Sequence, residues 1–115
     1  MIEEQSTALE RPSAFGFSVA QAGGAARVAV CGEIDIASSD ELRSALLTLS
    51  DQGVRQVTVD LAELAFIDST GLGALIRVLK HYRERGGDLK LANPTRPVAK
   101  VLEITSLDKL FEIDS

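Results

Sequence analysis

Apolar residues alternate with small or polar ones near the start of the chain, where Phe15, Phe17 and Val19 occupy every second position. This period of two is typical of a strand with one buried face. A second apolar run, residues 26–31, follows after the glycine pair 23–24. Two such runs separated by glycines predict a β-hairpin.

Two longer segments carry apolar residues at the spacing of one helix face. Ser38 and Glu41 have capping-box spacing, so the first helix is predicted to begin at Ser38 and to end before Gly53. The second is predicted to begin at Asp68-Ser69-Thr70 and to end at Gly86-Gly87. The apolar stripes are Leu42, Ala45, Leu46 and Leu49 in the first helix, and Leu72, Leu75, Ile76, Leu79 and Tyr82 in the second.

Shorter elements fill the remaining chain. Residues 57–61 and 89–91 are predicted strands, with a short turn at residues 62–64. Thr95 is placed to cap a third helix. Residues 107–113 fit either a final strand or a helical turn followed by a strand.

The predicted element order is β-β-α-β-α-β-α-β. Strands that alternate with helices indicate a single α/β domain, with a mainly parallel mixed sheet and the N-terminal hairpin at an edge. The alternation at 15–19 leaves one sheet face partly open, so the helices are expected largely on the other side. We assign residues 14–115 to this domain and residues 1–13, which are polar and aperiodic, to a flexible tail.

Composition narrows the class of protein. The chain has 115 residues with ordinary hydrophobic and charged fractions, which is enough to form one domain without a disulfide or a metal. A net charge of −5 argues against nucleic acid or an anionic membrane as the main partner. One cysteine, and no apolar run long enough to span a membrane, indicate a cytoplasmic protein.

Residues suited to catalysis are scarce. The single histidine, His81, falls on the polar face of the second helix, far along the chain from any pattern of a nucleophile and its base. Gly71-Leu72-Gly73 lacks the spacing of a phosphate-binding loop, and no metal-ligand cluster is visible. Cys31 ends an apolar strand and is interpreted as a small buried hydrophobe. The chain is therefore predicted to be no enzyme and to carry no cofactor or metal.

The stretch from Phe66 to Gly73 has two open interpretations. Phe66 and Ile67 are expected to hold the run against the core, and Ser69 with Thr70 then cap the second helix. Alternatively, Ser69 is exposed at the helix start and accepts a phosphoryl group, which adds about −1.5 to −2 charge at neutral pH. Gly71 and Gly73 each cost about 1 kcal/mol in a helix, so they serve either internal packing or the approach of a partner.

Two motifs together resemble a known family. Gly32-Glu33-Ile34-Asp35 after the second strand, and Phe66-Ile67-Asp68-Ser69-Thr70-Gly71-Leu72-Gly73 before the second helix, resemble the anti-sigma-factor antagonists of bacteria, which are small STAS-domain proteins. The resemblance extends from about Phe15 to Ile113 and includes Asn93-Pro94. It implies a STAS-like fold.

The resemblance also implies a function. Family members bind an anti-sigma factor that is a serine kinase, and so release its sigma factor. The kinase phosphorylates the residue matching Ser69, the complex separates, and a phosphatase reverses the step. Thr70 is implied as a supporting or secondary acceptor. The implied partner-binding residues are Glu33, Asp35, Asp68, Ser69, Thr70, Gly71, Leu72 and Gly73.

Two alternatives stay open. The first is a STAS binding module within a stress-signalling or lipid-transport complex that has no sigma factor. The second is an acyl-transfer enzyme using Ser69, for which the sequence supplies no evident base. The expected oligomeric state is a monomer or a weak dimer, because an edge strand permits pairing between copies.

Overall fold

The computed structural model describes residues 15–114, and within this range five strands form one sheet in the order β1-β2-β3-β4-β5. Strand β1 is antiparallel to β2, and the other neighbouring pairs are parallel. The elements are β1 (Gly16–Ala22), β2 (Ala25–Ile34), α2 (Ile36–Asp51), β3 (Gln56–Ile67), α3 (Ser69–Glu84), β4 (Asp88–Ala92), α4 (Arg96–Ile104), the 3-10 turn η1 (Leu107–Lys109) and β5 (Ile113–Asp114). The predicted mixed sheet with an N-terminal hairpin at its edge is confirmed. The predicted tail, residues 1–13, lies outside the described residues.

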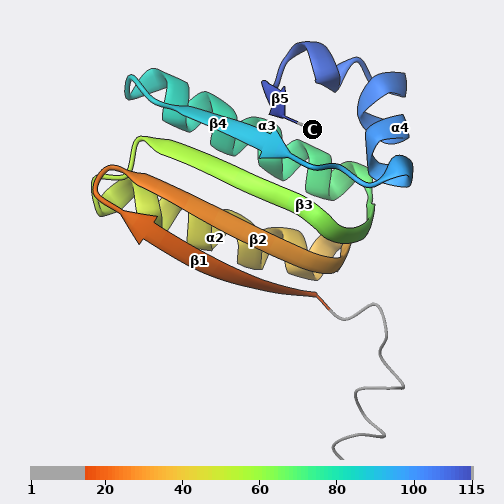
Figure 1. Ribbon diagram of the computed structural model, residues 1–115, viewed down its shortest axis with the longest axis horizontal. Coiled ribbons are helices and arrows are strands. Elements are labelled where there is room, and N and C mark those ends of the chain that lie inside the picture. Colours follow the sequence, from red (N-terminus) through yellow and green to blue (C-terminus); the bar gives the residue numbers. More distant parts are fainter. Residues whose placement is uncertain (1–14, 115) are drawn as a thin grey trace, which may run out of the picture.

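Helices α2 and α3 lie side by side against one face of the sheet, and α4 lies at the end where β3 and β4 finish (Figure 1). Strand β2 shows the consequence for burial. Its residues Ala26, Val28 and Val30 are buried in the core, and the residues between them are exposed on the other face. The expectation that the helices pack largely on one side is therefore confirmed.

The core between the helices and the sheet includes one aromatic residue that also bonds to the backbone. Tyr82 of α3 is fully buried, and its hydroxyl donates a hydrogen bond to the carbonyl of Leu46 in α2, with an O···O distance of 2.6 Å. Burial raises the pKa of Tyr82 to about 12. This bond ties the two helices together at a point where apolar contacts alone would leave a phenol unpaired.

Strand β3 is longer than the sequence predicts. It continues to Ile67 through residues 62–64, where the pattern favours a turn. Two bulges explain the difference, because each inserts one extra residue of β3 into its pairing with β2 and so shifts the burial pattern by one position. The amide of Ala62 donates to Asp60 Oδ1 at 3.0 Å inside the first of them. The sequence pattern of the bulged strand is therefore that of a strand followed by a turn, although the structure forms one continuous strand.

Three local predictions are also corrected. Helix α2 begins at Ile36 with Asp35 as its cap, and Ser38 is the third helical residue rather than the cap. Cys31 is exposed, because the alternation along β2 turns it to the open face of the sheet. Thr95 is the N-cap residue of α4 as predicted, but its hydroxyl makes no capping hydrogen bond and donates to the carbonyl of Leu64 at 2.9 Å.

The chain after α4 resolves the remaining ambiguity. It forms a 3-10 turn followed by the short strand β5, the second of the two predicted arrangements. Strand β5 pairs in parallel with β4 and closes the sheet on the side opposite β1.

Candidate functional site

Two strand-to-helix junctions lie next to each other at the carboxyl edge of the sheet. Ile34 at the end of β2 pairs with Ile67 at the end of β3. The next residues, Asp35 and Asp68, are the caps of α2 and α3, and the amide of Asp68 donates to the carbonyl of Ile34 at 3.2 Å. The two helix N-termini are thus side by side (Figure 1). Each carries one capping carboxylate.

The first junction is fixed by a reciprocal capping box. Asp35 Oδ1 accepts from the amide of Ser38 at 3.0 Å and from its hydroxyl at 2.9 Å, while the amide of Asp35 donates to Ser38 Oγ at 2.8 Å. Hydrogen bonds from the backbone and side chain of Ser38 hold the pKa of Asp35 below its usual value. Ser38 Oγ also lies 3.3 Å from the carbonyl of Glu33, which links the cap to the end of β2.

At the second junction, the residue that caps α3 is Asp68 and not Ser69. Asp68 Oδ1 accepts from the amide of Gly71 at 2.9 Å, so the prediction that Ser69 and Thr70 cap α3 is wrong. Ser69 is the first helical residue and is exposed, and Thr70 is half-buried. Within residues 15–114 the Ser69 hydroxyl makes no side-chain hydrogen bond. An exposed hydroxyl without a structural bond is available for modification.

Gly71 and Gly73 have different environments. A Cβ atom at Gly71 would lie 2.6 Å from Ile34 Cγ2 and 2.8 Å from Ile67 Cγ1, so this glycine lets α3 pack on the ends of β2 and β3. At Gly73 the nearest atom to a Cβ would be Arg77 Nη1 at 3.7 Å, which is ordinary contact. Gly71 therefore serves internal packing, and Gly73 borders open surface.

The predicted site residues consequently fall into two layers. Asp35 and Ser69 are exposed, and Glu33, Asp68, Thr70 and Gly73 are partly exposed. Gly71 and Leu72 are buried directly beneath them. The structure thus brings all eight residues together, but the last two support the surface instead of forming it.

Two exposed apolar residues were not identified as site residues from the sequence. Ile36, the first residue of α2, is 72% exposed, and Phe66 near the end of β3 is 47% exposed. The expectation that Phe66 packs into the core is wrong, since it alternates with the buried Ile67 and pairs with Glu33. The available signal was the position of Ile36, which lies one residue after the cap and outside the apolar stripe of its helix.

His81 lies too far along α3 to activate Ser69. Its Nε2 is 3.0 Å from Ser50 Oγ, and its Nδ1 is 3.2 Å from Arg85 Nη1. A serine and a histidine in contact suggest a catalytic pair, but Ser50 is buried and the third group is a cation. A catalytic triad needs an orienting carboxylate there. Across residues 15–114 there is also no cluster of side chains suited to hold a metal.

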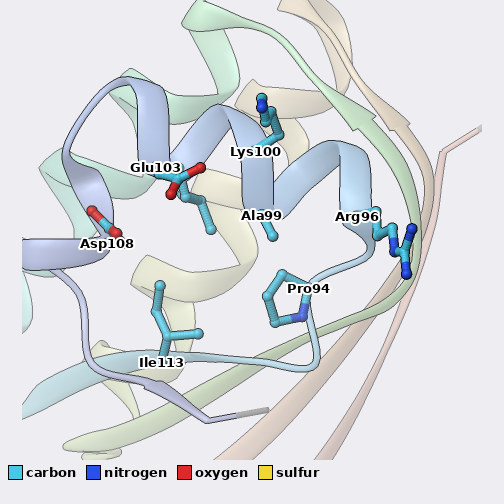
Figure 2. Close-up of a pocket in the computed structure, with 8 residues that line it drawn as sticks. Pro94, Arg96, Ala99, Lys100, Glu103, Asp108 and Ile113 are labelled. Carbon is cyan, nitrogen blue, oxygen red and sulfur yellow. The ribbon is translucent and has the colours of Figure 1, made fainter.

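A separate hollow of about 460 Å³ lies beside α4 (Figure 2). Pro94 and Ile113 point into it, whereas Arg96 and Lys100 point away. The hollow is lined by Pro94, Arg96, Ala99, Lys100, Leu102, Glu103, Asp108 and Ile113. None of the predicted site residues contributes to this lining.

The chain matches the model of a known protein family. The STAS domain model matches residues 17–115, so the chain belongs to the STAS domain family. Among curated proteins, it is 34% identical over 89 residues to the anti-sigma-B factor antagonist of Bacillus subtilis (strain 168), covering 77% of this chain and 81% of that protein. It is 30% identical over 87 residues to the anti-sigma-B factor antagonist of Staphylococcus epidermidis, covering 76% and 81%.

Solved structures agree on the fold. The anti-sigma factor antagonist SpoIIAA in its unphosphorylated form superimposes with a TM-score of 0.76 at 22% identity, over 87% of this chain and 89% of that one. An anti-sigma factor antagonist from Mycobacterium paratuberculosis gives 0.77 at 23% identity, over 90% and 87%. SpoIIAA of Bacillus in its phosphorylated form gives 0.69 at 20% identity, over 87% and 92%. In the part of this chain that the structure describes, no helix is long and apolar enough to cross a membrane.

Proposed function

We propose that this protein is an anti-sigma-factor antagonist, which binds a serine-kinase anti-sigma factor and is switched off by phosphorylation of Ser69. The observation that carries the proposal is the position of Ser69. Its hydroxyl is exposed on the first residue of α3, directly beside the start of α2 and its exposed Ile36. The names of the curated relatives support the same role.

The surface around Ser69 combines apolar contacts with negative charge. Ile36 and Phe66 supply exposed apolar side chains that a partner can bury, while Asp35 and Asp68 lie at the two helix starts. Phosphorylation would add about −1.5 to −2 charge to this surface. In the free protein the helix N-terminus accommodates that charge. In a complex the same charge would be buried against apolar groups and carboxylates, which opposes binding.

Each residue then has a proposed role. Ser69 is the phosphoryl acceptor, with Thr70 as a supporting or secondary one, and Glu33, Asp35, Asp68 and Gly73 contact the kinase. Gly71 and Leu72 act from beneath by fixing the start of α3. ATP and magnesium belong to the kinase, and a phosphatase restores the unmodified serine. The protein acts in the cytoplasm by binding, without catalysis or direct contact with nucleic acid or membrane, as a monomer or weak dimer.

The test begins with co-purification of the tagged protein from its source bacterium and identification of its partners and phosphosites by mass spectrometry. The purified partner is then incubated with the antagonist and ATP. We expect phosphate at Ser69, tight binding by Ser69→Ala in the presence of ATP, and binding weakened at least about tenfold by Ser69→Asp, a loss of about 1.4 kcal/mol. Thr70→Ala is the matched control and should still be phosphorylated at Ser69.

Recovery of only membrane-transport subunits, with Ser69 unmodified, would favour the alternative of a STAS module without a sigma factor. Stoichiometric labelling of Ser69 by a fluorophosphonate would instead indicate an acyl-transfer enzyme. Either result would refute the proposed function.

A further inference from the structure

Arg77 lies over Gly73 on the side of α3 that also carries Ser69. Its Nη1 atom is 3.7 Å from the position of a Cβ at Gly73. Residues four apart on a helix lie above one another, at a rise of about 6 Å. Ser69, Gly73 and Arg77 therefore follow one another along a row of i, i+4 neighbours, which we call the column, and the Arg77 side chain reaches back by one turn to the level of Gly73.

Gly73 keeps this column clear. A helical side chain leans toward the N-terminus and covers the turn before its own Cα. Any side chain at position 73 would therefore lie between the guanidinium of Arg77 and the hydroxyl of Ser69. Unlike Gly71, Gly73 has no close internal neighbour that requires a glycine. The need to keep the column open therefore explains why position 73 is a glycine, although glycine is unfavourable inside a helix.

The acidic residues around Ser69 favour a basic side chain near the start of α3. Glu33, Asp35 and Asp68 all lie at the two junctions, and Arg77 is the first basic residue after Asp68 along the chain. Asp68 Oδ1 already accepts the hydrogen bond from the amide of Gly71, so that amide is not free to bind a phosphate. Among residues 15–114 the Arg77 side chain has no hydrogen-bond or ion-pair partner, whereas Arg83 on the same helix is paired with Asp88 at 3.0 Å.

We infer that Arg77 binds the phosphate of phosphorylated Ser69 across Gly73, within the same helix. The phosphoester extends the serine side chain into the gap of about one turn that separates it from the guanidinium. A charge-assisted N–H···O contact of about 2.7–2.9 Å then holds the phosphate on the surface of α3. Arg77 is a positioning residue for the modified state.

This inference rests on the proposed function only for the presence of a phosphate on Ser69. The test therefore installs phosphoserine at position 69 of the full chain during synthesis, so that no kinase is needed. Phosphorus NMR then measures the second pKa of the phosphate in the parent protein and in its variants. A bound cation stabilises the dianion and lowers this pKa, so loss of the cation raises it.

We expect Arg77→Ala to raise the phosphate pKa by roughly 0.5 unit, as for a partly exposed ion pair, and Arg77→Lys to restore part of the shift. Lys80→Ala removes the same charge one turn further from Ser69 and should leave the pKa within about 0.1 unit of the parent value, because solvent screens a more distant exposed charge. Gly73→Leu keeps Arg77 but fills the column, and it should raise the pKa as Arg77→Ala does. Amide spectra of each variant verify the fold.

The inference is overturned if Arg77→Ala leaves the phosphate pKa unchanged, if Lys80→Ala shifts it equally, or if Gly73→Leu has no effect. A second readout is the side-chain Nε–Hε signal of Arg77, which should move on phosphorylation of Ser69. Failure of the proposed function would appear differently, as a partner that does not phosphorylate Ser69, and would leave this titration intact.

Discussion

Alanine substitutions at Gly71 and Gly73 are expected to change stability in opposite directions. Both replace a helical glycine, and each gains about 1 kcal/mol from helix propensity. At Gly71 the new methyl group would lie 2.6 Å from Ile34 Cγ2 and 2.8 Å from Ile67 Cγ1, both on buried side chains. Such overpacking costs about 1–3 kcal/mol. At Gly73 the methyl group meets only Arg77, at 3.7 Å.

The net expectation is a loss of about 1 kcal/mol for Gly71→Ala and a gain of up to about 1 kcal/mol for Gly73→Ala. Urea unfolding followed by circular dichroism measures both, and for a domain of this size each kcal/mol corresponds to about 4–8 °C in the thermal midpoint. The Gly73 variant serves as the matched control for helix propensity. A Gly71→Ala protein as stable as the Gly73→Ala protein would refute the packing role of Gly71.

Two further predictions concern the dependence of stability on pH. Tyr82→Phe should lose about 1 kcal/mol at neutral pH, because the bond to the Leu46 carbonyl is gone. The variant should also lose less stability than the parent at alkaline pH. In the parent, the raised pKa of Tyr82 contributes stability that is lost between pH 10.0 and about 12. Asp35→Asn keeps a capping side chain but cannot titrate. The lowered pKa of Asp35 gives stability that is lost as the pH falls below 3.8, so urea midpoints of this variant should fall less steeply in acid than those of the parent.

The elements that could be predicted from the sequence are those with an unbroken period. The hairpin, the two long helices and the parallel strands all follow from apolar spacing, and the adjacent junctions follow from parallel pairing. Strand β3 could not be predicted to its full length, because its bulges depend on the pairing with β2 and interrupt its period. The sequence also does not determine the cap of α2, because Asp35 and Ser38 both suit a cap and only the geometry distinguishes them.

At the candidate site, the sequence predicts which residues are present, but it does not predict which of them are buried and which are exposed. The sequence identified Gly71 and Gly73 as unusual without separating their roles, because that difference depends on Ile34 and Ile67, which reach Gly71 from other elements. The apolar pair Phe66-Ile67 predicts that both side chains face the core, whereas in the structure Phe66 is exposed and Ile67 is buried. Exposure of large apolar side chains is set by packing around them, which a single strand's pattern does not contain.

Under the proposed function, the paired junctions would give one local structure both the recognition surface and its regulation by phosphorylation. Ile34 and Ile67 align in the sheet, an aspartate caps the helix after each, and the first helical residues are Ile36 and Ser69. The equivalent position thus carries an exposed apolar side chain on α2 and a hydroxyl on α3. Under the proposed function, a partner that buries Ile36 would also cover the neighbouring Ser69, so a phosphate there would lie inside the contact. Under the proposed function, we therefore expect binding strength and sensitivity to phosphorylation to be coupled through the register of β2 and β3.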